Sequence, residues 1–125
     1  MSKRILIADD EPNIVISLEF LMKREGFDVQ VAADGEAALQ AIDAQLPDLV
    51  LLDIMLPKKD GFEVCQQIRA NPQGRSIKVL MLTAKGRDTE VSKGIALGAD
   101  AYMTKPFSTR DLVEKVRQLL GLSAA

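Results

Sequence analysis

Polar side chains with complementary chemistry follow four of the apolar runs in this sequence. Asp9 and Asp10 come after the first run, Asp53 after the third, Thr83 after the fourth and Lys105 after the fifth. Three carboxylates gathered in one place repel each other, and each pair costs about 4 kcal/mol at ~4 Å and an effective dielectric near 20. A divalent cation relieves that repulsion, and oxygen ligands without histidine or cysteine suit Mg²⁺ or Mn²⁺. Lysine and threonine side chains can then bind phosphoryl oxygens, so these residue types favour phosphoryl transfer.

The composition excludes several other kinds of chemistry. The 125 residues include no histidine and a single cysteine, Cys65. Histidine metal sites, histidine acid–base catalysis, an internal disulfide and a cysteine zinc cage are therefore excluded. Cys65 has helical spacing with Phe62 and Ile68, which predicts a small core residue rather than a redox sensor. The net charge of −2 and the lack of a basic cluster argue against direct binding of nucleic acid.

The elements that must position these groups follow from the apolar pattern. Runs that are almost continuously apolar are typical of strands buried on both faces, and only the second run alternates with polar residues. The predicted strands are 4–8, 28–32, 49–52, 78–82 and 101–103. The segments that follow each strand have apolar residues at helical spacing, which predicts helices. Gly26 and Gly98 are expected to end two of these helices, and Ser108 is expected to start another. The second helix is expected after Gly35. This alternation predicts a parallel sheet covered on both faces.

The predicted polar groups all stand at the carboxyl ends of strands, which is where open α/β sheets bind their ligands. We therefore expect them to form one site. With 47% apolar and 27% charged residues, residues 1–125 are expected to form a single domain. The longest apolar run, 49–52, is far shorter than the ~20 residues of a membrane helix. The first residues have no signal-peptide layout, so a cytoplasmic location without membrane contact is expected.

The chain resembles the receiver domains of two-component response regulators over essentially its whole length. The matching segments are 5–11 (ILIADDE), 51–57 (LLDIMLP), 60–61 (DG), 82–84 (LTA), 98–102 (GADAY) and 104–107 (TKPF). Each segment alone is a weak signal, but their joint order and their positions at strand ends are specific. The resemblance implies a doubly wound, flavodoxin-like α/β fold. Its five parallel strands would have the order 2-1-3-4-5, with five helices on two faces.

The resemblance also implies a metal site and a phosphoacceptor. Asp53 is the residue expected to become an aspartyl phosphate. Asp10, the Asp53 carboxylate and the backbone carbonyl of Met55 are expected to bind Mg²⁺ directly, while Asp9 holds the ion mainly through water. An aspartate oxygen is a weak nucleophile, so positioning and neutralisation of charge must supply most of the rate.

Other roles implied by the resemblance concern phosphoryl recognition and switching. Thr83 and Lys105 are expected to bind two phosphoryl oxygens, and the bond between Lys105 and Pro106 is expected to be a cis peptide. Tyr102 matches an aromatic switch residue that moves inward together with Thr83. The positions that tune the lifetime of the phosphorylated state are Met55 and Lys85. Neither an apolar nor a basic side chain orients an attacking water well, so slow self-dephosphorylation is expected.

The implied function is a phosphorylation-dependent switch, not a conventional enzyme. A sensor histidine kinase or a phosphotransfer protein would supply the phosphoryl group. The sequence motifs are similar to those of receivers that precede winged-helix DNA-binding domains, yet the sequence stops just after the last predicted helix. It could be a stand-alone regulator or a piece excised from a larger one, and its native-looking start and lack of a linker favour the former. The output face is expected on the fourth helix, fifth strand and fifth helix. There Ala101 and Val91 depart from a pattern of charged pairs, which favours a downstream protein partner, with a monomer or a weak phosphorylation-dependent dimer.

Alternative interpretations remain at this point. A pseudo-receiver that acts only as a docking module would share most of the motifs. A phosphatase of the haloacid dehalogenase type needs a second aspartate two residues after the nucleophile, where this sequence has Met55. A flavodoxin-like cofactor binder needs a phosphate loop rich in hydroxyl residues and glycine, which does not follow the first strand. The acidic run of Asp9, Asp10 and Glu11 could by itself merely start a helix, because acidic residues favour helix N-termini and Pro12 suits an early helical position.

Overall fold

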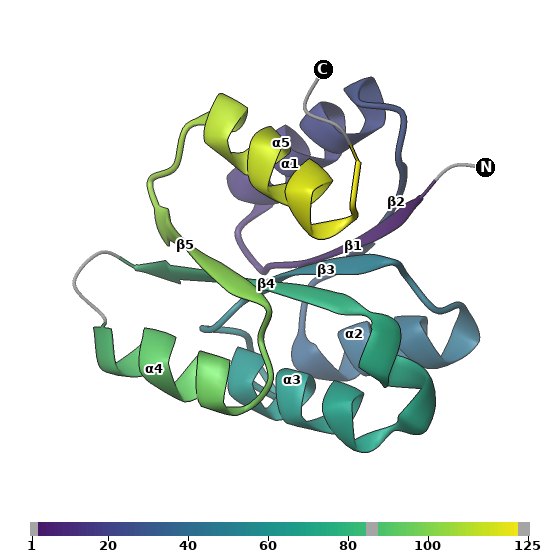
Figure 1. The fold of residues 1–125 in the computed structure, drawn as a ribbon, viewed down its shortest axis with the longest axis vertical. Helices are drawn as coiled ribbons and strands as arrows, with labels where there is room; N and C mark the ends of the chain where they lie inside the picture. Colours follow the sequence, from purple (N-terminus) through teal and green to yellow (C-terminus); the bar gives the residue numbers. More distant parts are fainter. Residues whose placement is uncertain (1–2, 85–87, 123–125) are drawn as a thin grey trace.

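The computed structural model describes residues 3–84 and 88–122 as a layered α/β fold (Figure 1). The strands are β1 (Arg4–Ala8), β2 (Asp28–Ala32), β3 (Leu49–Asp53), β4 (Lys78–Ala84) and β5 (Ala101–Lys105). The helices are α1 (Pro12–Arg24), α2 (Gly35–Ala44), α3 (Gly61–Ala70), α4 (Asp88–Ala96) and α5 (Thr109–Leu119), with a short 3₁₀ helix, η1 (Pro72–Ser76), after α3. The predicted alternation of strands and helices is confirmed.

The five strands form one parallel sheet in the order β2-β1-β3-β4-β5, as the resemblance implied. Helices α1 and α5 cover one face of this sheet, and α2, α3 and α4 cover the other (Figure 1). The strand order reverses direction between β1 and β3, because β2 lies outside β1 and β4 lies outside β3. A crevice at the carboxyl ends of β1 and β3 is therefore the expected ligand site.

Alternate residues of the three central strands build two separate cores. The residues that pack with α1 and α5 are Ile5, Ile7, Leu49, Leu51, Leu80 and Leu82. The residues that pack with α2 and α3 are Leu6, Ala8, Val50, Leu52, Val79 and Met81. Burial of both faces explains why these strands appear as continuous apolar runs in the sequence. Each fully buried side chain of this size contributes about 1.5–3 kcal/mol to the stability of the fold. The well-packed sheet is therefore a rigid support for the residues at its carboxyl edge.

Helix ends follow local signals in the sequence. The side chains of Asp34, Asp60 and Ser108 cap α2, α3 and α5 by accepting hydrogen bonds from backbone N–H groups three residues later. A cap of this kind contributes about 1 kcal/mol. Gly26 and Gly98 have φ values of 91° and 109° after α1 and α4, where side-chain residues are disfavoured. The predicted helix ends at both glycines are confirmed.

Three strands are longer than predicted, and this places site residues inside the sheet. We expected strands to stop at residues 52, 82 and 103, but β3, β4 and β5 continue to Asp53, Ala84 and Lys105. Asp53 pairs in register with Leu82, and Thr83 pairs with Thr104. The prediction was wrong because it ended each strand at the last apolar residue, whereas the backbone ladder needs only N–H and C=O groups.

Two smaller differences concern helices. We expected α2 after Gly35, but Gly35 is its first residue. The 3₁₀ helix η1 was not predicted. Within the described residues, no helix has the length and apolar character needed to cross a membrane.

Candidate functional site

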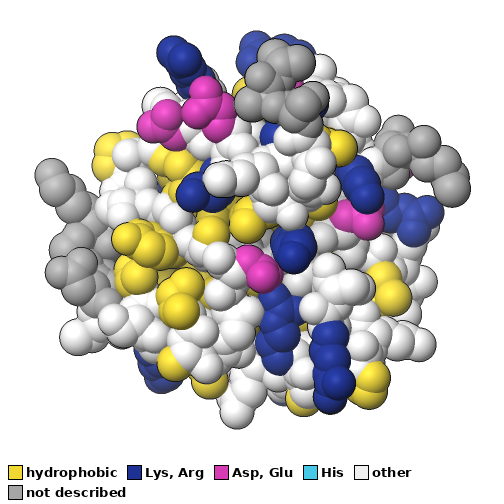
Figure 2. Space-filling model, in the orientation of Figure 1, with side chains coloured by type: hydrophobic (Ala, Val, Ile, Leu, Met, Phe, Trp, Pro, Cys, Tyr) yellow, Lys and Arg dark blue, Asp and Glu magenta, His cyan; other side chains and the backbone are white. Residues whose placement is uncertain are grey.

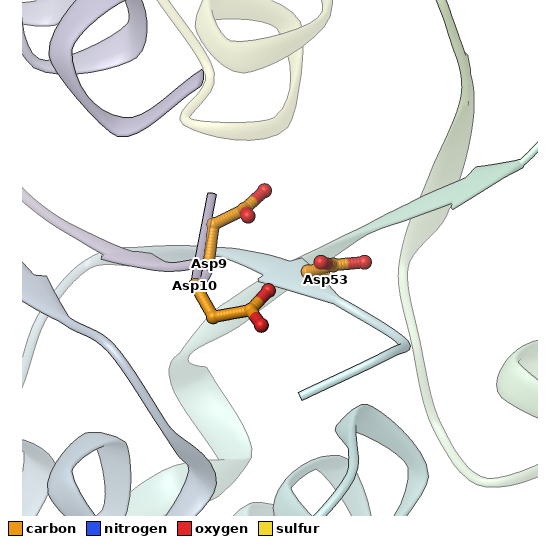
Figure 3. Close-up of side chains that lie close together, drawn as sticks. All are labelled: Asp9, Asp10 and Asp53. Carbon is orange, nitrogen blue, oxygen red and sulfur yellow. The ribbon is translucent and has the colours of Figure 1, made fainter. Parts of the chain in front are cut away.

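The predicted acidic residues meet at the carboxyl edge of the sheet. Asp9 and Asp10 follow β1, and Asp53 is the last residue of β3. Each offers a carboxylate oxygen, and these oxygens all lie within 4.8 Å of one another. Figure 3 shows the carboxylates of Asp9 and Asp10, at the end of β1, close to that of Asp53 at the end of β3. Asp10 and Asp53 border a cleft of about 320 Å³ that is also lined by Thr83 and Lys105.

Asp53 is held in place by the chain around it. The residue is only 5% exposed. Its Oδ1 accepts a hydrogen bond of 3.2 Å from the backbone N–H of Met55, and its Oδ2 lies 3.6 Å from Nζ of Lys105. Burial, followed by the negative charge of Asp9, raises the pKa of the Asp53 carboxyl, and Lys105 and the Met55 N–H oppose this only in part. The carboxylates of Asp53 and Asp9 therefore repel each other in the folded protein.

Asp9 is completely buried although it is a carboxylate. Its Oδ1 accepts a hydrogen bond of 2.9 Å from the backbone N–H of Glu11, and its Oδ2 accepts one of 3.2 Å from Nζ of Lys105. A buried carboxylate without such partners would be strongly unfavourable. Helix α1 does begin at Pro12, but Glu11 occupies its cap position without a side-chain cap hydrogen bond. Helix capping therefore does not account for this acidic segment.

Lys105 is the cationic centre of the cleft. Its Nζ lies 3.2 Å from Asp9, 3.6 Å from Asp53 and 3.7 Å from Oε1 of Glu11. Burial alone lowers the pKa of Lys105, but the attraction of Asp53, Asp9 and Glu11 outweighs it, so the pKa lies above the ordinary lysine value. The side chain is therefore a permanent ammonium ion at neutral pH.

The donor set fits a divalent cation that prefers oxygen. Among the described residues, the four carboxylates of Asp9, Asp10, Glu11 and Asp53 outnumber the ammonium group of Lys105, which contacts three of them. Uncompensated negative charge in a partly buried pocket of oxygen ligands is the environment that suits Mg²⁺. Asp10 is exposed, so it can bind an ion that reaches the cleft from solvent. Asp9, Asp10 and Asp53 would hold the ion.

The remaining predicted residues occupy different parts of this region. Thr83 is 3% exposed and lines the cleft. Met55 also lines it, with 62% of its surface exposed, and a direct metal contact of its carbonyl stays a prediction. The peptide bond between Lys105 and Pro106 is cis.

Two further predicted residues lie apart from the acidic cluster. Tyr102 is in β5, in register with Met81, and it is 46% exposed; its role as a switch stays a prediction. Lys85 lies outside the described residues. Cys65, in contrast, is fully buried among core residues, and burial raises the pKa of its thiol, as expected for a packing residue.

Glu11 contacts Lys105, but no role was predicted for this glutamate from the sequence. The signal that could have identified it is its place directly after Asp9 and Asp10 in one acidic run.

Fold and site together define a doubly wound α/β domain with a cluster of acidic side chains at the carboxyl edge of its sheet. The family model for the response regulator receiver domain matches residues 5–117. The chain belongs to that family, which makes it a regulatory receiver domain and not a conventional enzyme. The haloacid dehalogenase and cofactor-binding alternatives are therefore set aside.

Individual relatives agree with this assignment. The alkaline phosphatase synthesis transcriptional regulatory protein PhoP of Bacillus subtilis is 48% identical over 123 residues, which are 98% of this chain and 50% of the relative. The chain thus spans about half the length of that curated relative. A putative response regulator from Chloroflexus aurantiacus has a similar structure, with a TM-score of 0.93, 36% identity and coverage of 97% and 99% of the two chains.

One relative of known structure contains a bound metal ion. The receiver domain of the Pseudomonas aeruginosa sensor histidine kinase PA1611 carries a magnesium ion coordinated in its active-site cleft. It is 28% identical to this chain, with a TM-score of 0.89 and coverage of 97% and 99%. A homologous receiver thus binds Mg²⁺ in its cleft, and this chain has the acidic triad of Asp9, Asp10 and Asp53 for the same ion.

Proposed function

We propose that this chain is a receiver domain, extending over residues 1–125, in which Asp53 accepts a phosphoryl group in a Mg²⁺-dependent reaction. The observation that carries the proposal is the position of Asp53. Its carboxylate lies in an acidic cluster and 3.6 Å from the Lys105 ammonium, at the edge of a cleft. A purely structural aspartate would not need a cleft, a buried acidic neighbour and a cation at the same time.

The side chains around Asp53 divide the chemistry between them. An oxygen of Asp53 forms the new P–O bond while the P–N bond of a donor phosphohistidine breaks, and the leaving imidazole nitrogen keeps the electron pair. The Met55 N–H donates to Oδ1 and so orients the carboxylate. The Lys105 ammonium stabilises negative charge on the transferring group. Mg²⁺ held by Asp9, Asp10 and Asp53, with Met55 contributing its carbonyl, would neutralise further phosphoryl charge.

The phosphorylated state would act as the signal. The product carries about −1.5 to −2 charges and strong acceptor oxygens beside Lys105 and Thr83. Moving a two-state equilibrium from 1:99 to 99:1 needs about 5.5 kcal/mol of differential interaction. Charge-assisted hydrogen bonds of about 1.5–3 kcal/mol each can supply that amount. We therefore assign Thr83 and Lys105 to phosphoryl recognition, and Thr83 with Tyr102 to the switch.

The partners in this proposal are a histidine kinase or a phosphotransfer protein upstream and a protein partner downstream. The downstream surface would be the face made by α4, β5 and α5. Ile95 in α4 and Tyr102 in β5 are each 46% exposed there. Figure 2 shows apolar side chains gathered over β5 and α4 on this face. Exposed apolar side chains in one patch are typical of protein contacts. A cytoplasmic location and a monomer or weak dimer belong to the same proposal.

The proposal is tested with a small phosphodonor and the purified chain. Incubation with acetyl phosphate and Mg²⁺ should add one phosphoryl group, seen by intact mass, and the adduct should be labile to acid and absent from Asp53→Asn. EDTA should prevent its formation. If the wild-type chain gives no adduct while Mg²⁺ is bound, the proposal fails and a docking module without phosphorylation becomes the better interpretation.

A further inference from the structure

The loop that joins β3 to α3, residues 54–60, is fixed at its site end by close backbone approach. The N–H of Gly61 donates a hydrogen bond of 2.9 Å to the carbonyl of Ile54. A methyl group at Gly61 would lie 2.6 Å from the carbonyl oxygen of Asp53, which is too close for any side chain. The first residue of α3 therefore presses directly on the backbone of the phosphoacceptor.

The tip of the same loop is fixed on a different helix. The carbonyl of Pro57 accepts a hydrogen bond of 2.8 Å from Lys59 within the loop and one of 3.1 Å from Gly35, the first residue of α2. Lys58, which lies between Pro57 and Lys59, has a φ of 67°. These three residues therefore form a tight turn. The N–H of Gly35 has no partner within its own helix, as for every first-turn residue, and Pro57 satisfies it.

Contact between Gly35 and the loop tip leaves no room for a side chain. A methyl group at Gly35 would lie 2.6 Å from both the carbonyl carbon and the Cβ of Lys59, and it would overlap the carbonyl oxygen. Gly35 does not have a positive φ, so alanine suits its backbone and only space forbids it. Any side chain at position 35 must therefore displace the loop or the helix.

Charge contributes less to this contact than shape does. Nζ of Lys58 lies 3.8 Å from Asp34 and 3.9 Å from Glu36 at the start of α2. The Lys58 side chain is 59% exposed, and exposed ion pairs of this length contribute about 0–1 kcal/mol. The buried side chain of Leu56, in contrast, packs in the same core as Ala38 and Ile42 of α2. The loop thus rests on α2 through packing, one hydrogen bond and the missing Cβ of Gly35.

We infer that Gly35 is a positioning residue for phosphoryl transfer, because the amino end of α2 sets where the loop places the backbone of Met55. The N–H of Met55 donates to Asp53, and its carbonyl is the predicted metal ligand. A shift of the loop tip moves both groups relative to Asp53. This inference rests on the proposed function, since it concerns the ion and the phosphoacceptor of the same site. Misplacement by about 1 Å, even from a substitution remote from the chemistry, can lower a rate about 100-fold.

Gly35→Ala tests the inference against a matched control, Gly26→Ala. Gly26 has a φ of 91°, and a methyl group added there would meet nothing within 4 Å, so alanine at this position strains the backbone without touching the loop. We expect Gly35→Ala to weaken Mg²⁺ binding to the unphosphorylated protein, measured by calorimetry, by about tenfold or more, and to slow phosphorylation by acetyl phosphate about 10–100-fold. Gly26→Ala should lower stability and leave both quantities at the wild-type value.

A second pair of variants covers the case in which Gly35→Ala does not fold. Lys58→Pro fixes φ near −65°, which is incompatible with the observed turn, at an exposed position outside the core. Lys58→Asn removes the ion pairs but tolerates a positive φ. Lys58→Pro should weaken Mg²⁺ binding, and Lys58→Asn should not.

The outcomes separate the two proposals. Normal Mg²⁺ affinity in both Gly35→Ala and Lys58→Pro would overturn the positioning role, because the metal site would then not depend on the position of the loop tip. A wild-type protein that binds no Mg²⁺ and takes up no phosphoryl group would instead overturn the proposed function.

Discussion

Replacement of Lys105 by methionine removes the ammonium group that contacts Asp9, Asp53 and Glu11 while keeping a side chain of similar length. At an effective dielectric of 20, separations of 3.2, 3.6 and 3.7 Å correspond to about 5 kcal/mol of attraction each. Glu11 is 60% exposed, so solvent screens its share, and desolvation offsets much of the rest. Removing one partner of a buried pair costs about 3–5 kcal/mol. With 20% of the Lys105 side chain exposed, we expect the lower end, about 3 kcal/mol, for the metal-free protein.

The same substitution should have the opposite effect on the ion. The ammonium group and Mg²⁺ neutralise the same carboxylates, so each reduces the affinity of the site for the other. Lys105→Met should therefore bind Mg²⁺ more tightly than the wild type, although it should no longer be phosphorylated efficiently. Mg²⁺ should also restore more stability to the variant than to the wild type, because ligand binding to the native state stabilises it by mass action.

Urea denaturation monitored by circular dichroism, with EDTA or with Mg²⁺, measures the change in stability. Calorimetry measures the change in Mg²⁺ affinity. Lys23→Met is a suitable control, since Lys23 makes an exposed ion pair with Glu19 of 3.0 Å that contributes about 0.3–0.5 kcal/mol. Equal stability of Lys105→Met and wild type without metal, or weaker Mg²⁺ binding by the variant, would refute the electrostatic account.

Three further outcomes are expected. Asp53→Asn should raise the urea midpoint of the metal-free protein at neutral pH, because burial and Asp9 raise the pKa of Asp53 and so disfavour its ionised form in the fold; a lower midpoint would count against this. Burial raises the pKa of Cys65, so its contribution to stability is complete below about pH 8.5 and is lost as the pH rises through the folded pKa; Cys65→Ala should show a smaller decline in this range. Phosphorylated Asp53 should lose its phosphoryl group slowly with Mg²⁺ and no phosphatase, since Met55 cannot orient water, and a lifetime of seconds by intact mass would contradict that.

Local features of the sequence predicted the parts of the fold that depend on local physics. Apolar runs located the strands, and Ser108 marked a helix start because capping is a contact between residues three apart. Strand order could not be read from periodicity, since residues such as Ile5 fit several neighbours equally well. That order came from the resemblance to a family.

The acidic residues of the site were predictable for a related reason. Parallel strands bring their carboxyl ends to one edge, so an aspartate after each of two neighbouring strands must lie near the other. The distances within the cluster, and the place of Glu11 beside Lys105, depend on side-chain packing that no pattern encodes. In the sequence, Gly35 stood out only as the residue after which the second helix was expected. Its close approach to Lys59 joins residues far apart in the chain, and only the folded structure reveals it.

The acidic residues that are proposed to carry the function also destabilise the metal-free fold. Asp9 and Asp53 are buried in a sheet whose central strands are packed on both faces, so their carboxylates cannot move apart to relieve repulsion. Apolar residues of similar volume would often stabilise such a position. The rigid sheet instead keeps this repulsion in place, and a cation or the charge of a phosphoryl group changes it by several kcal/mol. An edge of this kind can therefore respond to ligands, whereas the two apolar cores that flank it cannot.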